Sequence, residues 1–351
     1  MASEQDLLVE TVRDILGSFE PFVLTPERPW DEGLWSALAE AGLTGVGVDE
    51  DAGGSGGELA DVVAIVRTLA AGAAAVPVAE QLLVAAPALL AADLDLPSPE
   101  EPLTFTVAPD LSAVPDGGGR VRLAGTATCV PWTGVATSVV VLAGTAEAPV
   151  LALVHADGLP VVPAANLAGE PRGTITFDAT PAVGATLTAE QADAFRARYA
   201  LARSVQIAAA LEQVLTWTVE YAGERQQFGR PLAKFQAIQM QLAQMAGEVT
   251  AVTAIVDAAV QGLDRGAAEL PLLAAAAKVR AGAAVEVVAR LAQQVHGAIG
   301  FTQEHKLHHL TRRCWSWRDE AGGEATWAPV LGAGLVAGGG DQLWATLTRL
   351  G

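Results

Sequence analysis

Apolar residues recur at helical spacing near the start of the chain and again from residue 188 onward. In the clearest stretch, apolar positions alternate at intervals of three and four: Phe235, Ile238, Leu242, Met245, Val249, Val252 and Val256. This spacing places them along one face of a helix that packs against other helices. Further helical runs cover 58–71, 78–92, about 189–222 and 271–296, and a shorter one follows Gly300. The C-terminal runs predict a bundle of about four helices.

Capping residues mark where several of these helices begin and end. Ser3 with Asp6, and Thr188 with Gln191, have the spacing at which two side chains cap a helix start reciprocally. Asp31 is expected to open a short helix that Gly42 closes.

Between Leu103 and about Val183 the pattern changes to short β-branched runs separated by Gly and Pro, at 104–107, 139–142, 150–154 and 174–177. They predict a small antiparallel β-domain of six or seven strands, either a sandwich or a barrel. The acidic, proline-containing segment 93–102 is a plausible linker. The predicted fold is therefore α+β and mostly α: an N-terminal helical domain (1–102), a middle antiparallel β-domain (103–187) and a C-terminal four-helix bundle (188–351).

Composition narrows the class of protein. The 351 residues are 51% hydrophobic and 17% charged, which excludes a disordered chain. The net charge of −19 argues against nucleic acid or an anionic membrane as the main partner, since both require a basic face. Cys129 and Cys314 are too few for a disulfide framework. The acidic N-terminus lacks a signal peptide, and Pro or Gly interrupts the apolar stretches 69–92 and 123–146, so we expect a cytoplasmic protein.

Two segments of the C-terminal part carry candidate binding chemistry. In Glu224–Leu232, an arginine beside an aromatic residue in a turn can hold a diphosphate and stack on a planar ring. The alternative is a helix connection with a solvated arginine. In Gln294–Phe301, two glycines three residues apart allow a close backbone approach, and the alternative is a simple helix C-cap.

A third segment concentrates cations: His305, Lys306, His308, His309, Arg312, Arg313 and Arg318. The i, i+4 spacing of His305 and His309 is compatible with zinc. However, no carboxylate or cysteine completes a ligand set, and the flanking cations oppose a metal ion. The segment is better explained as a surface or subunit-contact face, with no metal site.

In combination, these segments resemble the acyl-CoA dehydrogenase family. The resemblance rests on Leu34–Trp35, on 45–48 with the glycines of 53–57, on 224–229 and on 294–301, in that order along the chain. It implies the same three-part fold, FAD as cofactor and α,β-dehydrogenation of an acyl-CoA thioester. It further implies that FAD lies between the β-domain and bundle of one subunit, while a neighbouring subunit holds the adenine and pyrophosphate end.

The resemblance assigns a half-site to this chain, meaning the residues that a subunit offers to its neighbour's flavin. They are Arg225, Gln227 and Phe228 for the diphosphate and adenosine, Leu232 and Gln236 one turn further on, and Gln294, Gly297 and Ala298 for the backbone approach.

The chain departs from the family pattern where a subunit serves its own flavin and substrate. Residues 106–113 lack the glycines and the final Ser-Asp of the family's flavin loop, and 129–134 replace its Trp-Ile-Thr-Asn strand. The position of the family's catalytic glutamate falls at Ala321, and the alternative base position of some members falls at about Tyr199.

The chain thus keeps the residues that it would offer to a neighbour's flavin and lacks those that would serve its own flavin and substrate. In this respect it resembles the base-less subunit of a heteromeric acyl-CoA dehydrogenase. The expected partner is a homologous catalytic subunit in an α2β2 assembly, with an electron-acceptor flavoprotein downstream. The expected substrate class is an acyl-CoA, with a CoA ester of a steroid side chain as the narrower suggestion.

Two other functions stay open at this point. Glu320, one residue before the expected base, and Glu324, three after it, could restore a carboxylate in a self-sufficient enzyme. Glu320 is otherwise expected to be a charge partner of Arg313 or Arg318. The remaining alternative is a flavin-free scaffold subunit, which would not need the Arg225–Gly229 segment.

Overall fold

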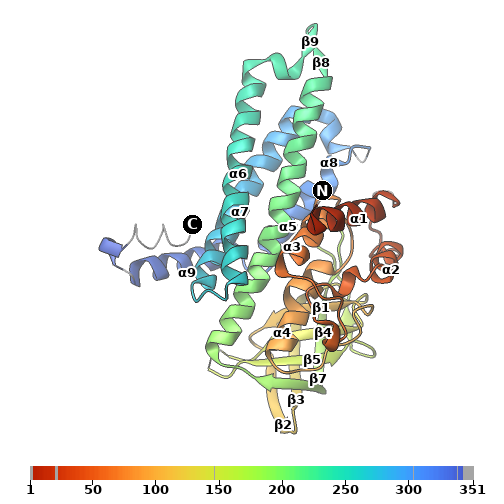
Figure 1. The fold of residues 1–351 in the computed structure, drawn as a ribbon, viewed down its shortest axis with the longest axis vertical. Coiled ribbons are helices and arrows are strands. Elements are labelled where there is room, and N and C mark those ends of the chain that lie inside the picture. Colours follow the sequence, from red (N-terminus) through yellow and green to blue (C-terminus); the bar gives the residue numbers. More distant parts are fainter. Residues whose placement is uncertain (1–2, 20–22, 146, 303, 338, 343–351) are drawn as a thin grey trace. The chain divides into compact units, whose positions relative to one another are not determined.

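The computed structural model describes residues 3–19, 23–145, 147–302, 304–337 and 339–342 (Figure 1). It divides into two compact units, Met1–Leu69 with Ala74–Ala202, and Ala70–Ala73 with Arg203–Gly351. The finer division at 102/103 and 187/188 stays a prediction.

The first unit begins with helices. They are α1 (Glu4–Gly17), α2 (Glu32–Glu40), α3 (Leu59–Ala71) and α4 (Ala86–Ala91), with short 3-10 turns at Leu43–Gly45 and Glu50–Ala52. The predicted caps are confirmed: the Asp6 N–H donates to the Ser3 hydroxyl (3.1 Å), and the Leu34 N–H donates to the Asp31 carboxylate (3.1 Å). In the glycine loop, a side chain at Gly54 would collide with the Val48 carbonyl, which explains that glycine.

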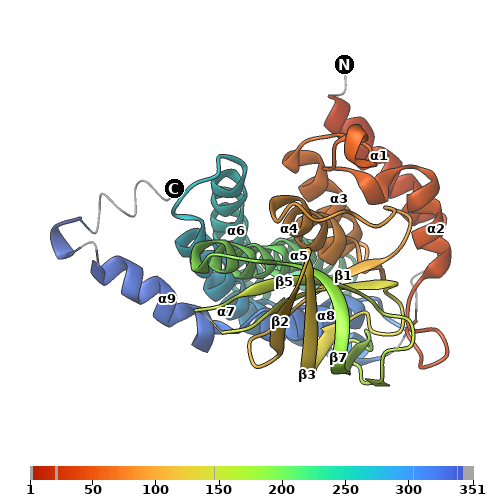
Figure 2. The same cartoon turned by 90° about the horizontal axis from the view of Figure 1, so that it is seen from below.

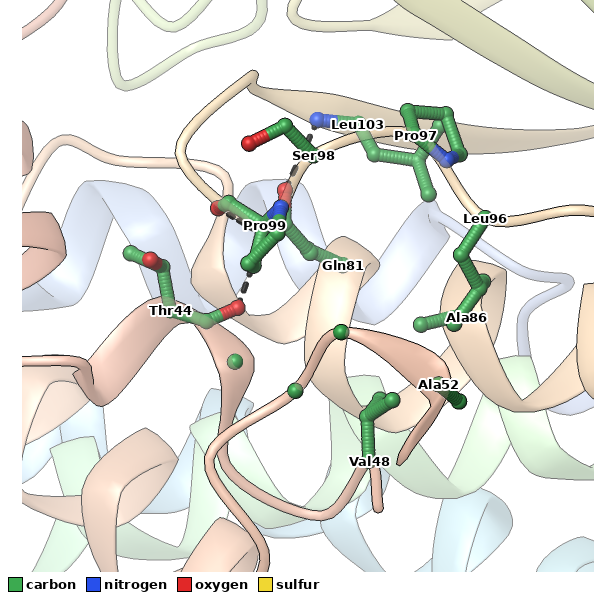
Figure 3. Close-up of a pocket in the computed structure, with 13 residues that line it drawn as sticks. Thr44, Val48, Ala52, Gln81, Ala86, Leu96, Pro97, Ser98, Pro99 and Leu103 are labelled. Atoms are coloured by element: carbon green, nitrogen blue, oxygen red, sulfur yellow. Dashed lines mark hydrogen bonds between the residues drawn. The ribbon is translucent and has the colours of Figure 1, made fainter. Parts of the chain in front are cut away.

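The helix predicted over 78–92 is π-helical in its first part, Ala79–Ala85. There the buried Gln81 amide joins three segments of the first unit (Figure 3). Its nitrogen donates to the carbonyls of Thr44 (2.9 Å) and Pro99 (2.8 Å), and its oxygen accepts from the Leu103 N–H (2.9 Å). The adjacent cavity of about 20 Å³ has room for about one water molecule, so its role is structural.

Replacing this amide is expected to destabilise the protein. Gln81→Leu leaves the buried Leu103 N–H without its acceptor and should lower the free energy of unfolding by about 1–3 kcal/mol. Urea denaturation of the whole chain measures the effect, with the exposed Gln261→Leu as the matched control. Equal stability of the two variants would show that the Gln81 hydrogen bonds contribute little.

A seven-stranded sheet follows, as predicted in number. Its strands are β1 (Leu103–Ala108), β2 (Ser112–Gly117), β3 (Arg120–Pro131), β4 (Ser138–Ala143), β5 (Val150–His155), β6 (Val161–Val162) and β7 (Arg172–Thr186). They form one sheet in the order β1-β4-β5-β7-β3-β2, with β6 on β7 (Figures 1 and 2). The structure corrects the purely antiparallel prediction, because β1 pairs with β4 in parallel. The β2–β3 hairpin lies between these two strands in sequence and supplies the crossover that a parallel pair requires.

The C-terminal helices are α5 (Ala189–Glu224), α6 (Gln236–Asp264), α7 (Leu270–His296), α8 (Leu307–Asp319) and α9 (Glu324–Ala337). The predicted cap of α5 is confirmed by hydrogen bonds of 2.9 and 3.2 Å between Thr188 and Gln191. α6 and α7 lie side by side (Figure 1), and the predicted apolar face of α6 is buried at Met245, Val249, Val252 and Val256. A short hairpin, β8 (Gln226–Gln227) and β9 (Arg230–Pro231), joins α5 to α6.

One helix among the described residues, α6, is long and apolar enough to cross a membrane by length and composition, with 28% of its apolar window buried. A single such helix is weak evidence for a membrane span, because helices of packed bundles meet the same criterion.

Candidate flavin half-site and base position

The β8–β9 hairpin presents Phe228 at its tip. Phe228 (φ 52°) and Gly229 (φ 80°) both adopt the left-handed conformation, which a two-residue hairpin turn of this kind requires. Glycine adopts it freely, whereas phenylalanine does so at a cost. The Phe228 side chain is 92% exposed. An aromatic side chain held in a strained turn and left in solvent indicates a binding role.

The hairpin leaves Arg225 available while fixing its backbone. The Arg225 N–H donates to the Tyr221 carbonyl, and the Leu232 N–H donates to the Arg225 carbonyl, both at 2.8 Å. The other arginine of the hairpin, Arg230, lies 4.2 Å from the ring centre of Phe235. Among the described residues, the exposed Arg225 guanidinium makes no hydrogen bond or ion pair.

The remaining half-site residues lie on either side of this hairpin and at the end of α7. Gln227 is exposed in β8, Leu232 is half-buried in a 3-10 turn, and Gln236 is exposed as the first residue of α6. Gln294 and Ala298 are exposed. Gly297 (φ 63°) ends α7, and a Cβ added to it would meet open space. Gly297 is thus the C-cap that the simpler interpretation expects, and it also leaves its backbone open to a ligand.

Tyr221 brings the two half-site segments together. It lies one helical turn before Arg225 and stacks on His296, the neighbour of Gly297, with ring centres 4.5 Å apart. Its hydroxyl also donates to the His296 carbonyl at 3.3 Å. Sequence analysis missed this residue, although a tyrosine at i−4 from a candidate arginine shares its helix face and is a usable signal.

The cationic segment is partly internal. Arg313 is only 1% exposed and donates to the His309 carbonyl at 3.1 Å, whereas the Lys306 ammonium lies 4.4 Å from the Trp217 ring centre. Burial lowers the pKa of His309 to about 4. Among the described residues, no three His, Cys, Asp or Glu side chains converge as a metal site. The expectation of a surface or subunit-contact face is therefore wrong at Arg313, which packs inside.

At the base position the structure places no carboxylate. Ala321 adopts φ 57°, and its carbonyl accepts from the Trp327 indole N–H at 2.8 Å. At the alternative base position, in the first unit, Tyr199 is buried edge-on against Phe105 with ring centres 5.4 Å apart.

The two carboxylates beside Ala321 are both ion-paired. Sequence analysis expected Arg313 or Arg318 as the partner of Glu320, but the structure pairs Glu320 with Arg203 at 2.8 Å. Arg318 pairs with Glu324 instead, at 2.7 Å. Arg203 is 1% exposed and the Glu320 side chain 14%, so this pair is largely withdrawn from water. A carboxylate held in this way is poorly placed to take a proton from a substrate.

Lys278 completes this base-position cluster, which we define as Arg203, Lys278, Arg318, Glu320 and Glu324. Its ammonium is buried and donates to the carbonyls of Trp317 (3.0 Å) and Arg318 (2.5 Å), the last turn of α8. A cation at this end of a helix satisfies carbonyls that have no partner within the helix. Burial, and after it the nearby charge of Arg203, lower the pKa of Lys278 to about 7, against the opposing effect of Glu320, Glu324 and Asp319.

This shift predicts a rise in stability with pH. Between about pH 7 and 9 the unfolded chain keeps the Lys278 proton that the folded chain loses, so the free energy of unfolding should increase. The expected gain is about 2 kcal/mol over these two units. Urea unfolding at pH 7, 8 and 9 measures it, and Lys278→Met should remove the rise. An unchanged slope in that variant would assign the effect to other groups.

Residues 106–113 and 129–134, where the sequence departs from the family pattern, lie in the first unit. Residues 106–113 form the end of β1, a turn and the start of β2. In the 129–134 segment, Trp132 is 3% exposed and lies 5.5 Å from the guanidinium of the buried Arg172. Arg172 in turn pairs with Glu170 at 3.0 Å. The one tryptophan of this segment is therefore committed to the interior of the first unit.

These residues can be compared with what each end of FAD requires. The exposed Arg225 and Phe228, together with the open backbone at Gly297, fit the diphosphate and adenosine end of FAD. At the reactive end of the flavin, the chemistry requires a carboxylate as base, and Ala321 at the base position does not supply one.

Comparison with known families identifies the family of the chain. Residues 2–92 match the model of the acyl-CoA dehydrogenase N-terminal domain, and residues 184–324 match that of the C-terminal domain. The chain belongs to the acyl-CoA dehydrogenase family, whose members are FAD-dependent oxidoreductases.

Among its relatives is the acyl-CoA dehydrogenase IpdE2 of Mycobacterium tuberculosis, which is 29% identical over 88% of this chain and 90% of its own length. The Tcur3481-Tcur3483 steroid ACAD variant is a solved structure with 29% identity and a TM-score of 0.85, over 95% of this chain and 98% of that one. The ChsE4-ChsE5 complex from Mycobacterium tuberculosis has 26% identity and a TM-score of 0.84, over 95% and 98%. These similarities confirm the predicted fold class.

Proposed function

We propose that this chain is the non-catalytic subunit of a heteromeric acyl-CoA dehydrogenase. In this proposal it supplies the adenine and pyrophosphate half of the FAD site, and the catalytic glutamate lies on a homologous partner chain. The observation that carries the proposal is Ala321 at the base position, flanked by carboxylates that arginines already neutralise. The similarity to a steroid ACAD and to a two-component complex supports a heteromeric assembly.

The reaction removes a proton from Cα and a hydride from Cβ of an acyl-CoA and leaves a trans-2-enoyl-CoA. FAD, when bound, accepts the hydride. Arg225 is positioned to neutralise the diphosphate, and Phe228 to cover an adjacent planar or apolar surface. Ala321 supplies no base, and its neighbours Glu320 and Glu324 are held by Arg203 and Arg318. In this proposal the Cα proton therefore goes to a base on the partner.

The proposal extends to substrate and assembly. A CoA ester of a steroid side chain is the proposed substrate class, supported by the steroid ACAD similarity. The proposed assembly is α2β2 and cytoplasmic, and a separate flavoprotein receives the electrons.

Flavin content tests the proposal directly. The chain is purified alone and after co-expression with an acyl-CoA dehydrogenase-like chain encoded beside it, and bound flavin is measured by absorbance. We expect little flavin alone and about one FAD per pair of chains in the complex. One FAD on every copy of the isolated chain would overturn the proposal. A stoichiometric complex without flavin would favour the scaffold alternative.

A further inference from the structure

Three aromatic side chains join the two segments of the half-site inside the second unit, and we call them the aromatic cluster: Tyr221, His296 and His305. Tyr221 stacks on His296 with ring centres 4.5 Å apart and meets His305 edge-on at 6.2 Å. The two imidazole rings lie 4.7 Å apart. The Tyr221 carbonyl accepts from the Arg225 N–H, and His296 directly precedes Gly297. Each segment of the half-site is therefore attached to a member of the cluster.

Backbone hydrogen bonds fix which nitrogen of each imidazole carries the proton. Nδ1 of His296 lies 2.8 Å from the Ala292 carbonyl oxygen, and because a carbonyl only accepts, this nitrogen carries the proton. Nδ1 of His305 accepts from the Leu307 N–H at 3.1 Å, so the proton of the neutral ring lies on Nε2. The remaining sites for a second proton are therefore Nε2 of His296 and Nδ1 of His305.

Neither of these sites suits a second proton in the folded chain. His296 is 3% exposed, and its Nε2 atom is buried without a hydrogen-bond partner among the described residues. A proton there creates a buried cation whose new N–H has no acceptor. A proton on Nδ1 of His305 faces the Leu307 N–H, and the hydrogen bond between them is lost. The folded cluster therefore requires neutral imidazoles, and acid favours its opening.

Charged groups of α5 and α8 lie near the cluster. On α5, Glu224 and Arg225 follow one turn after the cluster's tyrosine and are exposed. At the start of α8, Lys306 and His308 oppose a positive charge on the neighbouring imidazole. Glu304, the carboxylate next to that imidazole in sequence, is exposed, and no carboxylate in the described part of the chain pairs with either ring.

These surroundings lower the pKa of both imidazoles. Burial is the main cause at His296, and the nearby His305 adds to it, against the opposing effect of the hydrogen bond to Ala292. Burial is also the main cause at His305, followed by Lys306 and His308. The opened chain binds protons at the ordinary histidine value of 6.5, whereas the folded cluster does not, so opening becomes easier as the pH falls below that value.

We propose that the aromatic cluster positions the two segments of the half-site and releases them on acidification. Its three members are positioning residues, and none of them is assigned a contact with the flavin. The inference rests on the proposed half-site, whose binding of FAD it makes dependent on pH. FAD is held above about pH 7 and released below about pH 6.

Hydrogen exchange of the isolated chain tests the opening itself. Between pH 7.5 and 5.5 the protection factors of the amides at 293–302 should fall by about tenfold to hundredfold, because one or both imidazoles gain a proton only in the opened form. The double variant His296→Asn with His305→Asn keeps a donor for Ala292 and an acceptor for Leu307, and it does not titrate. Its protection factors should fall less than about twofold.

The matched control is His155→Asn, which removes the exposed histidine of the first unit and should behave as the unmodified chain. If the double variant does not fold, His305→Asn alone, at a half-buried position, should still reduce the fall by severalfold. An equal fall in these variants and in the unmodified chain would overturn the proposal.

The second experiment follows FAD in the complex with the partner chain. Dissociation of FAD should be about tenfold faster at pH 5.5 than at pH 7.5, and the double variant should lose most of this pH dependence, whatever its absolute rate. Equal acceleration in both complexes would refute a role of the cluster in holding FAD. The half-site is judged separately, by the flavin content of the unmodified complex at pH 7.5. A complex without FAD refutes the half-site, and the exchange experiment still decides whether the cluster opens.

Discussion

Arg225→Ala is expected to remove most of the flavin from the complex while leaving this chain folded. The Arg225 backbone anchors the hairpin through two hydrogen bonds of 2.8 Å, and alanine keeps both of them. The guanidinium makes no hydrogen bond or ion pair within the described part of the chain, so its removal costs the fold little. A guanidinium that holds a diphosphate contributes strongly to binding, because the guanidinium and the diphosphate are both charged.

The expected loss is on the order of tenfold to a hundredfold in FAD affinity, as for removal of a charged hydrogen bond. Flavin retained per pair of chains after gel filtration measures it, with the midpoint of thermal unfolding of the isolated chain as the check on folding. Arg265→Ala removes an exposed arginine elsewhere and should change neither quantity.

Unchanged flavin content in Arg225→Ala would contradict the half-site assignment. A second substitution in the same hairpin, Phe228→Ala, tests the assignment independently. Its side chain is 92% exposed, so its truncation should spare the fold and weaken flavin binding.

Local sequence signals predicted most of the helices and their caps correctly, although α9 (Glu324–Ala337) was not among the predicted helices. The reciprocal caps at Ser3 and Thr188 depend on residues three positions apart, and such contacts are visible in the sequence. The apolar spacing of α6 likewise identified its buried face. The π-helical turn at Ala79–Ala85 was not predicted, because nothing in that run distinguishes an α from a π hydrogen-bond pattern.

Contacts between residues far apart in sequence were the ones that prediction missed. The Arg203–Glu320 pair joins α5 to the residue after α8, and no local pattern chooses Arg203 over Arg313 or Arg318. The parallel pairing of β1 with β4 was missed for the same reason, because the pattern within a strand does not indicate which strands are its neighbours. The half-site residues could be named from motifs, and the spacing of Tyr221 from Arg225 was a usable signal. The stacking of Tyr221 on His296, which connects the two segments, is visible only in three dimensions.

Glu320→Gln separates a structural role of this carboxylate from a catalytic one. Arg203 is 1% exposed, and its guanidinium donates to the Gln206 amide oxygen at 2.7 Å as well as pairing with Glu320 at 2.8 Å. Removing the negative charge leaves a buried cation without its counter-ion. Breaking a buried pair in this way destabilises proteins by about 3–5 kcal/mol.

We therefore expect a large loss of stability in Glu320→Gln and no specific loss of chemistry. Urea unfolding of the isolated chain measures the first. The second is measured in the complex, below the unfolding transition, as kcat per bound flavin, which should stay within about twofold of the unmodified enzyme.

The control is a double variant that removes the charge on both sides, Arg203→Met with Glu320→Gln. If the pair is structural, the double variant should be more stable than Glu320→Gln alone, because no buried charge is left unpaired. If Glu320 were the base of a self-sufficient enzyme, both variants would lose turnover by several orders of magnitude, whatever their stability. That outcome, together with dehydrogenation by the isolated unmodified chain, would assign the role of catalytic carboxylate to Glu320 and not to a residue of the partner.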